Sequence, residues 1–434
     1  MKLTSIEIIK ILRQAGFIAY WAGGSVRDML LGIRPKDFDI ATSAQPSDLK
    51  KLLEKIHPIG EKYGVVIAER KGLHFEVATF RSDSGYSDGR RPDAVLFTNP
   101  QEDAKRRDFT INALFYDPLA DKIYDFVGGQ DDLKNKLIRF IGDPHERILE
   151  DHLRIIRAIR FKNTFGFQYH PDTYQALKKH AKLSVKVSAE RLQGELHKMI
   201  LHLSFPQALE DMEDTGVLAL VLPEIQALKG VAQPPEYHTE GDVWTHTLRA
   251  IAALKPDASF ILRWAVFLHD VGKPETFKIA ERIRFDHHAE RSAEIVEKIL
   301  RRLKFSVKDM RIIQWLVKHH MMVYNVLDMP IGRRRHWFLN PWYLDLLEVN
   351  RCDASGTVPC DLSTYNKVLA LYRKDMKEMP REPKRLLTGE EIMALTGLKP
   401  GKKIAEILEE LRLLQLEKKL TTKAQAKVWL KKIT

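Results

Sequence analysis

Residues 23–28, Gly-Gly-Ser-Val-Arg-Asp, and residues 37–42, Asp-Phe-Asp-Ile-Ala-Thr, decide the fold of the first part of the chain. The apolar run Phe17–Trp21 leads directly into the paired glycines and predicts a strand, a tight turn and the start of a helix. Glycines at such a turn, including Gly24, let backbone N–H groups approach a phosphate, and the helix N-terminus adds partial positive charge. Arg27 adds a guanidinium for a charge-assisted contact with that phosphate. By themselves, paired glycines at such a place are more often simple turn residues.

Two aspartates change this interpretation. Asp37 and Asp39 are predicted to lie at the start of a strand over Asp37–Ala41, where residues i and i+2 point to the same face. Two adjacent carboxylates repel each other unless a cation lies between them, and Mg²⁺ prefers hard oxygen ligands of this kind. Two Mg²⁺ ions held there would activate an attacking hydroxyl and stabilise a leaving pyrophosphate. With the glycine turn just upstream, a nucleotidyl-transfer site is favoured over a solvated acidic turn.

The surrounding sequence predicts an α+β multidomain protein. In the first 140 residues, helices are expected at Ile6–Leu12 and, opened by Pro46, at Ser47–Ile56, with a hairpin formed by Val65–Glu69 and Phe75–Phe80. From about residue 148 onward, helical patterns dominate to the end of the chain.

Composition narrows the class of protein. The 434 residues include 44% hydrophobic and 29% charged residues, values typical of folded globular domains. The net charge of +12 suits a polyanionic partner but does not identify one. The two cysteines, Cys352 and Cys360, are too few for a disulfide framework and indicate a reducing compartment. With no signal peptide or membrane span recognisable in the sequence, we expect a cytoplasmic protein that does not bind membranes.

The glycine turn and the paired aspartates together resemble the head of the class II tRNA nucleotidyltransferase and bacterial poly(A) polymerase family. The similarity continues along the chain. Residues 86–95, YSDGRRPDAV, resemble the flexible loop of the family, residues 106–114, RRDFTINAL, its second head motif, and residues 125–133, DFVGGQDDL, its third. The resemblance implies that Asp37 and Asp39 hold Mg²⁺, that Gly24, Arg27 and Arg107 contact the nucleotide, and that Asp108 contacts its ribose.

Residues 150–161, EDHLRIIRAIRF, are predicted to form a helix that selects the base. Asp151 and Arg154 are three residues apart and would share a face, one accepting and one donating hydrogen bonds. Such a pair can match the Watson–Crick edge of cytosine or adenine, whereas uracil or guanine would leave polar groups unpaired. Arg157 and Arg160 continue the row of donors toward the triphosphate. A salt-bridged exposed helix would have similar charges, but the pattern resembles the template-mimicking helix of the family.

A short motif after this helix, Ser188-Ala189-Glu190-Arg191, resembles the neck motif of the family. Ser188 is a suitable residue to cap a helix. We therefore expect this motif to be structural.

A series of histidines and aspartates occupies the next part of the chain. Imidazole and carboxylate groups commonly bind divalent transition metals. The order His246, His269, Asp270, His288, His320, Asp353 resembles the ligand series of an HD phosphohydrolase domain. This implies a further divalent metal and a second activity, phosphodiesterase or phosphatase.

The C-terminal part is strongly basic. Residues 361–434 contain 17 Lys and Arg against 10 Asp and Glu, which is more than half of the net charge of the chain. Thr388 is a predicted N-cap, and Lys399, Lys402 and Lys403 precede or open a helix expected over Ile404–Leu416. A solvated pair of charged helices would look similar, but the segment resembles the tail with which the family grips tRNA.

Four segments are therefore expected: a nucleotidyltransferase head (1–140), a helical neck with the base-selecting helix (141–235), an HD domain (236–360) and a basic helical tRNA-binding tail (361–434).

The resemblance implies addition of C and A to the 3′ end of tRNA from CTP and ATP. Addition of A alone is the nearest alternative, and the intact loop at 81–95 disfavours a CC-only enzyme. A poly(A) polymerase is disfavoured because residues 59–66, IGEKYGVV, replace an arginine-rich stretch. HD phosphohydrolysis as the main activity and non-catalytic RNA binding remain open, and the sequence does not indicate an oligomeric state.

Overall fold

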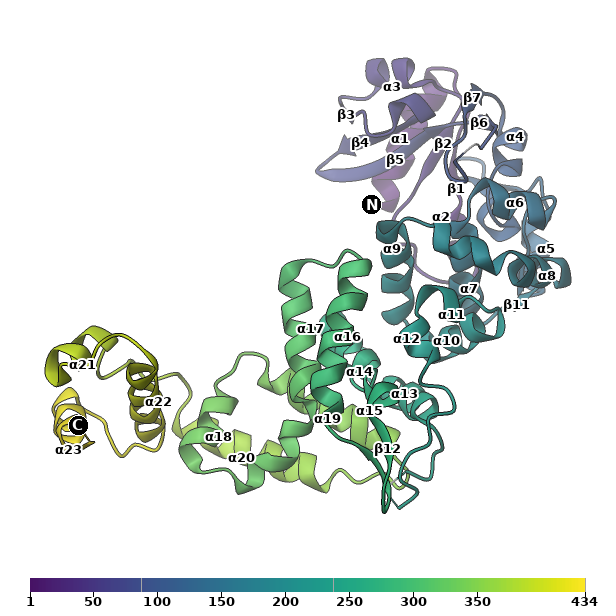
Figure 1. The fold of residues 1–434 in the computed structure, drawn as a ribbon. Coiled ribbons are helices and arrows are strands. Elements are labelled where there is room, and N and C mark those ends of the chain that lie inside the picture. Colours follow the sequence, from purple (N-terminus) through teal and green to yellow (C-terminus); the bar gives the residue numbers. More distant parts are fainter. Residues whose placement is uncertain (87, 237, 434) are drawn as a thin grey trace. The chain divides into compact units, whose positions relative to one another are not determined.

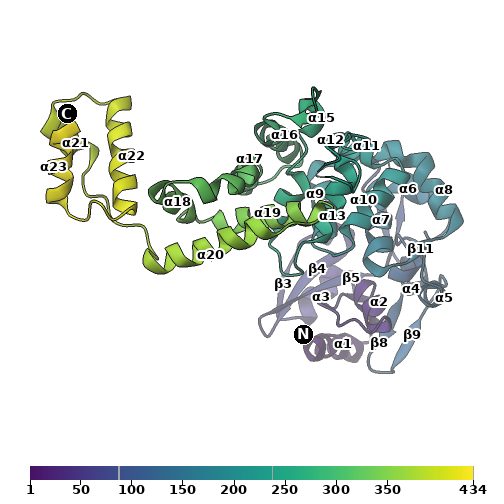
Figure 2. The same ribbon diagram turned by 90° about the horizontal axis from the view of Figure 1, so that it is seen from below.

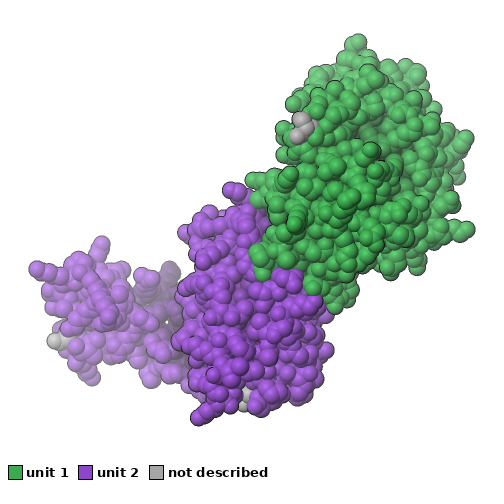
Figure 3. All heavy atoms as spheres, turned by 45° about the vertical axis from the view of Figure 1, so that its right-hand side comes forward, with its two compact units in different colours: residues 1–223 green, residues 224–434 purple. Residues whose placement is uncertain are grey.

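The structure, a computed structural model, describes residues 1–86, 88–236 and 238–433. Figure 3 shows its two units, residues 1–223 in green and residues 224–434 in purple. The mixture of a sheet-containing first unit and an almost entirely helical remainder confirms the predicted α+β class. Ser87, within the predicted flexible loop, lies outside the described residues.

A mixed seven-stranded sheet forms the centre of the first unit, in the order β3-β4-β5-β2-β1-β8-β9 (Figure 1). Strand β2 is parallel to β5 and antiparallel to β1, so Ile40 lies opposite both Trp21 and Val77. The strands of this sheet are β1 (Ala19–Ala22), β2 (Ile40–Thr42), β3 (Lys55–His57), β4 (Val65–Arg70), β5 (Leu73–Thr79), β8 (Phe115–Asp117) and β9 (Lys122–Tyr124). A separate hairpin pairs β6 (Arg81–Ser84) with β7 (Ala94–Phe97).

The first unit contains twelve described helices. α1 contacts β1 and β2, α2 follows the glycine turn after β1, and α3 contacts β3 (Figures 1 and 2). The helices are α1 (Lys2–Gln14), α2 (Gly24–Leu30), α3 (Pro46–Leu52), α4 (Pro100–Lys105), α5 (Gly129–Lys134), α6 (Pro144–Glu150), α7 (Leu153–Phe165), α8 (Pro171–His180), α9 (Ala189–Ile200), α10 (Phe205–Asp214), α11 (Leu218–Val221) and α12 (Pro223–Gln226). Only the first residue of α12, Pro223, belongs to the first unit; the rest of this helix belongs to the second. Short strands β10 (Leu137–Ile138) and β11 (Gln168–Tyr169) pair in parallel beside them.

The structure corrects two predicted elements of the sheet region. The helix expected over Ser47–Ile56 ends at Leu52, because Lys55–His57 pairs with β4 as an edge strand. The strand expected over Asp37–Ala41 begins at Ile40, so both aspartates precede it. The backbone of Asp39 nevertheless accepts a hydrogen bond from the Ala22 N–H at 3.0 Å, which fixes this segment beside β1.

The predicted base-selecting helix is also interrupted. α6 ends at Glu150 and α7 begins at Leu153, and Asp151 adopts an extended conformation between them. The Asp151 carboxylate accepts a hydrogen bond from the Leu153 N–H at 3.1 Å. Asp151 therefore lies at the entrance to α7, one turn before Arg154, rather than on a continuous helix with it.

The second unit is built from helices and one short hairpin. Its helices are α13 (Val243–Ala252), α14 (Phe260–Leu268), α15 (Lys273–Thr276), α16 (His288–Arg302), α17 (Val307–His319), α18 (Ile331–Phe338), α19 (Tyr343–Gly356), α20 (Ser363–Glu378), α21 (Gly389–Thr396), α22 (Lys402–Leu416) and α23 (Lys423–Ile433). A 3₁₀ segment, η4 (His320–Asp328), follows α17, and β12 (Phe277–Ile279) pairs with β13 (Ile283–Phe285). The last three helices share a small core that includes Ile392, Leu411 and Leu430.

Across the described ranges of the chain, no helix combines the length and the apolar character that crossing a membrane would require.

Candidate active sites

A cavity of about 620 Å³ in the first unit collects most of the predicted nucleotide-binding residues. Nine of the ten positions predicted in the head and neck line it: Gly24, Arg27, Asp39, Arg107, Asp108, Asp151, Arg154, Arg157 and Arg160. Among the described residues that line the cavity, Asp39 is present but its neighbour Asp37 is not; Asp37 is exposed. Ten cationic side chains and five carboxylates line the cavity, an excess of positive charge that suits a triphosphate.

The glycine turn at the start of α2 fixes one wall of this cavity. Gly23 has a φ of +68°, and a Cβ at this position would lie 2.9 Å from Nη1 of Arg107. Only glycine fits this conformation and this close approach without strain. The guanidinium of Arg27 donates to Oδ1 of Asn112 at 2.5 Å and lies over the ring of Phe165 at 4.5 Å.

Sequence analysis missed a third carboxylate beside the two aspartates. Because β2 and β5 pair in parallel with Ile40 opposite Val77, the preceding residues Asp39 and Glu76 are also neighbours. Burial, Glu76 and Asp37 together raise the pKa of Asp39 to about 6, and Arg107 opposes them. The only sequence signal for Glu76 was its place on the same alternating face of the strand as other polar residues.

This cluster of oxygens fits Mg²⁺. Asp39 and Glu76 line the cationic cavity, and Asp37, which does not, acts electrostatically on Asp39; carboxylates are the hard oxygen donors that this ion prefers. A bound cation would remove the repulsion that raises the pKa of Asp39.

Each predicted nucleotide-binding arginine already has a carboxylate partner. Arg107 binds Asp103 at 3.0 Å, Arg157 binds Asp108 at 2.6 Å, and Arg160 binds Glu195 at 2.5 Å. Burial alone would raise the pKa of Asp108, but Arg157 and Arg154 outweigh it and hold this pKa at about 2. These ion pairs keep the guanidinium groups in fixed positions around the cavity.

The two residues predicted to select the base are also held by the protein. Arg154 donates to Glu150 at 2.5 Å and to the Arg147 carbonyl at 2.8 Å. Asp151 accepts two hydrogen bonds from Arg191, at 2.9 and 2.7 Å. The structure thus brings both residues to the cavity, and it places Arg191, part of the motif predicted to be structural, in direct contact with Asp151.

The neck motif differs from the prediction at its first residue. Ser188 occupies the N-cap position of α9, but its side chain caps no backbone N–H of this helix in the described structure. Glu195, one turn after Arg191 on α9, instead binds Arg160 and Lys198.

A second cluster, in the second unit, contains all six residues of the predicted HD series. Asp270 lies at the centre: its carboxylate is 3.2 Å from Nε2 of His269, 3.5 Å from that of His288 and 3.9 Å from that of His320. Asp353 lies 3.0 Å from Nε2 of His246. His288 belongs to this cluster, whereas the side chain of the adjacent His287 is 87% exposed.

Backbone carbonyls orient three of these imidazoles. The Nδ1 atoms of His269, His288 and His320 lie 2.8, 2.9 and 2.7 Å from the carbonyls of Val266, Phe285 and Val317. This contact assigns the proton to Nδ1 and leaves Nε2 free to bind a metal, a common arrangement around metal ligands.

The HD cluster fits a divalent transition metal. Nε2 of His269 and Oδ2 of Asp270 are buried, and their close contacts are ion pairs, 3.2 Å between the two atoms and 2.7 Å from Oδ2 to the ammonium of Lys273. Burial, His288 and His269 lower the pKa of His320 to about 3, which keeps its ring neutral. Two overlapping ligand groups, His246–His269–Asp270 and Asp270–His288–His320, share Asp270.

The three lysines predicted to bind RNA lie around the N-terminus of α22 in the second unit. Lys399, Lys402 and Lys403 are exposed just before and at the start of α22, and Lys402 lies 3.8 Å from Glu406. Thr388 caps α21 in a capping box with Glu391, as predicted.

Three family models match the chain: "Poly A polymerase head domain" at residues 19–139, "Probable RNA and SrmB-binding site of polymerase A" at 166–229, and "HD domain" at 243–335. Fold, cavity and matches together define a protein with a head domain of the poly(A) polymerase type followed by an HD domain. The ranges do not fix the boundaries of the four predicted segments, which stay predictions.

Curated relatives and solved structures agree with this class. The chain is 33% identical over 90% of its length to the A-adding tRNA nucleotidyltransferase of Deinococcus radiodurans, covering 89% of that protein. It is 39% identical over 60% of its length to the CCA-adding enzyme of Ligilactobacillus salivarius, covering 65% of it. The crystal structure of the Bacillus stearothermophilus CCA-adding enzyme in complex with CTP aligns with 99% of this chain and 96% of that one, at 27% identity and a TM-score of 0.73.

The chain belongs to the class II tRNA nucleotidyltransferase and bacterial poly(A) polymerase family. Its matches span 53% to 65% of the length of the first four curated relatives, all CCA-adding enzymes.

Proposed function

We propose that this protein is a template-independent tRNA nucleotidyltransferase that adds C and A to the 3′ end of tRNA from CTP and ATP, with release of pyrophosphate. The observation that carries the proposal is the cavity of the first unit, where nine predicted positions meet beside a carboxylate cluster. The relative from Bacillus stearothermophilus, whose structure contains CTP, supports the choice of nucleotide.

In the proposed reaction, the terminal ribose hydroxyl of tRNA loses its proton to solvent and its oxygen attacks the α-phosphorus of CTP or ATP. The new ester bond forms as the bond to the β-phosphate oxygen breaks, and pyrophosphate leaves with the electron pair. Asp37, Asp39 and Glu76 would hold Mg²⁺, which when bound stabilises negative charge on the attacking and leaving oxygens. Arg27 and Arg107 bind the triphosphate, and Asp108 receives the ribose.

In the proposed base selection, Asp151 and Arg154 share or exchange their present partners with the base. Asp151 and Arg154 hydrogen-bond to the Watson–Crick edge of the base with donors and acceptors that now contact Arg191 and Glu150. A carboxylate has about four acceptor sites, so Asp151 can retain Arg191 while it accepts a base amino group. Uracil and guanine would leave buried polar groups unpaired, at about 1–3 kcal/mol each.

The test uses the full chain with Mg²⁺, CTP, ATP and three tRNAs that end before the first C, after one C, and after both. We expect addition to all three, ending after A, resolved at single-nucleotide length. A long adenylate ladder would contradict the proposal in favour of a poly(A) polymerase.

Addition of A alone is the nearest competing function. The relative from Deinococcus radiodurans, whose match covers 90% of this chain, is named an A-adding enzyme. Extension of only the tRNA that already ends in CC would establish this activity and imply a separate CC-adding partner.

A second activity is favoured by the buried, convergent ligands of the HD cluster. We infer a metal-dependent phosphohydrolase that acts on phosphate esters such as a 2′,3′-cyclic phosphate. A metal bound by the HD residues would supply an activated water. Lys273, held 2.7 Å from Asp270 and 2.8 Å from Gln233, places a positive charge beside the cluster for the phosphate. Hydrolysis that survives Asp39→Ala but is lost in His269→Ala would support it, and the reverse pattern would refute it.

A further inference from the structure

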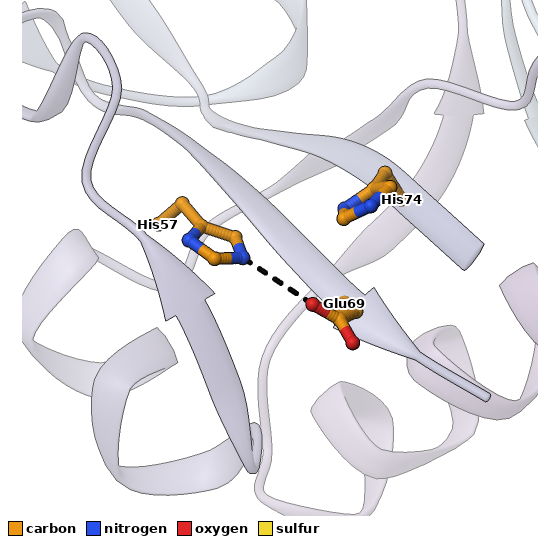
Figure 4. A group of neighbouring side chains, drawn as sticks. All are labelled: His57, Glu69 and His74. Atoms are coloured by element: carbon orange, nitrogen blue, oxygen red, sulfur yellow. Dashed lines mark hydrogen bonds and ion pairs between the residues drawn. The ribbon is translucent and has the colours of Figure 1, made fainter. Parts of the chain in front are cut away.

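Three side chains outside both clusters converge on one face of the sheet. His57 on β3, Glu69 on β4 and His74 on β5 come from adjacent strands, and one ligand atom of each lies within 4.8 Å of the other two (Figure 4). The register explains this proximity: Glu69 lies directly opposite His74, and His57 lies two residues along β3 from the partner of Glu69. Cross-strand neighbours on one face are held at such distances by the backbone alone.

The donor set has the chemistry of a transition-metal site. Two imidazole nitrogens and one carboxylate oxygen suit Zn²⁺ and similar ions, with a further position left for water. In a tetrahedral site with metal–ligand distances of about 2.0–2.1 Å, ligand atoms lie about 3.3 Å apart. Nε2 of His57 is 3.4 Å from Oε2 of Glu69, the contact dashed in Figure 4. The ligand atom of His74 lies within 4.8 Å of both others and completes the set.

The exposure of the three side chains and the charge of the Glu69 carboxylate both suit the binding of a metal ion. The side chain of His57 is 43% exposed and that of Glu69 21%, and His74 is exposed, so an ion can enter from solvent. Lys55 and His57 hold the pKa of Glu69 below its usual range, which keeps its carboxylate ionised.

The ammonium group of Lys55 occupies the position beside Glu69 that a metal ion would take. Its ammonium is 2.6 Å from the Oε2 atom of Glu69, while its side chain is 59% exposed. An exposed pair of this kind contributes little to stability, so a metal ion can displace the ammonium.

We propose that His57, Glu69 and His74 form a binding site for a divalent transition-metal ion, with Zn²⁺ the best-matched candidate, and that Lys55 competes for it. The site is separate from the HD cluster and independent of the proposed nucleotidyl transfer. It would fix the edge strand β3 to β4 and β5. Since successive side chains of a strand alternate, His74 and Glu76 face the same side, about 7 Å apart along β5, so the ion would lie next to the carboxylate cluster.

The test measures zinc bound per chain. The full chain, freed of metals with a chelator, is dialysed against Zn²⁺ in excess Mg²⁺, and bound zinc is quantified by mass spectrometry. We expect His57→Ala/His74→Ala to bind one zinc ion fewer than the wild type. Equal zinc contents would overturn the proposal.

Two further variants complete the design. His145→Ala/His180→Ala removes another contacting pair of histidines from the same unit, whose ring nitrogens are 3.0 Å apart, and should leave the zinc content unchanged. Lys55→Ala should tighten zinc binding severalfold, whereas unchanged or weaker binding would refute the competition for Glu69. If the double alanine variant does not fold, Glu69→Gln replaces it, because glutamine keeps the volume but lacks the charge.

Discussion

Arg154 serves both the fold and, in the proposed function, the choice of base. Its side chain is only 9% exposed and binds Glu150 and two backbone carbonyls. Such a fixed guanidinium presents donors in one orientation, which is what discrimination between bases requires.

We therefore expect Arg154→Ala to reduce the preference for CTP over UTP by on the order of 10- to 100-fold, since a lost contact to a buried base edge costs about 1–3 kcal/mol. Competition assays on one tRNA measure this ratio. Arg139→Ala, which removes a guanidinium paired with Asp132 outside the cavity, is the control. Unaltered selectivity of the Arg154 variant would contradict its role in base selection.

A second prediction concerns Asp108, whose pKa is held at about 2 in the folded protein. A carboxyl with a lowered pKa stabilises the fold above its unfolded pKa, and this stabilisation disappears as the pH falls toward the folded value. Asp108→Asn should thus be less stable than the wild type by about 2 kcal/mol at pH 7, and the difference should shrink between about pH 4 and pH 2. Urea unfolding at a series of pH values checks this, with the exposed Asp131→Asn as control. A difference that is constant with pH would exclude the ion pair with Arg157 as its cause.

The elements around the cavity show what the sequence could and could not predict. The glycine turn and the hairpin of β4 and β5 depend on local patterns, and the structure confirms them. The HD series was predicted from a resemblance; the structure brings its residues together, and their role as metal ligands stays a prediction. The break at Asp151 was not predicted, because the apolar spacing continues through it; in the folded chain the Asp151 carboxylate is held by Arg191, forty residues away in the sequence. Glu76 was missed for the same reason, since only the pairing of β5 with β2 brings it beside Asp39.

Arg191 on α9 donates a hydrogen bond to Asp151, which lies in the break between α6 and α7. Arg191→Ala should release Asp151 and raise the KM for both CTP and ATP, roughly tenfold for the loss of a charge-assisted pair. Arg191→Lys should recover part of the lost affinity, because lysine keeps the positive charge but has a single nitrogen in place of the two that contact Asp151. Steady-state kinetics measure both, and exposed Lys182→Ala is the control in the same neck region. A fall in kcat alone would show that Arg191 acts on the chemical step instead.

On the scale of the whole molecule, the nucleotide-binding cavity and the lysines predicted to bind the tRNA backbone lie in different units. The cavity belongs to residues 1–223, whereas Lys399, Lys402 and Lys403 belong to residues 224–434. Changes in the two units should consequently affect different kinetic constants.

Replacing these three lysines by alanine should raise the KM for tRNA and leave the KM for CTP unchanged, since they would contact the phosphate backbone only. The matched control removes the same charge from α23, with Lys427, Lys431 and Lys432 replaced by alanine. An equal effect of both triple variants would mean that overall charge, and not this turn, attracts the RNA.

The ion pairs that occupy the cavity have a consequence for binding in salt. A bare cluster of arginines collects mobile anions from solution, and each must be expelled before a ligand enters, so that affinity falls steeply as ionic strength rises. Here Asp103, Asp108, Asp151 and Glu195 act as tethered counterions to Arg107, Arg157, Arg191 and Arg160. An incoming triphosphate exchanges with these attached groups rather than with dissolved ones. The cavity should accordingly release few ions on binding, and it should hold nucleotide almost equally well across a wide range of salt concentrations.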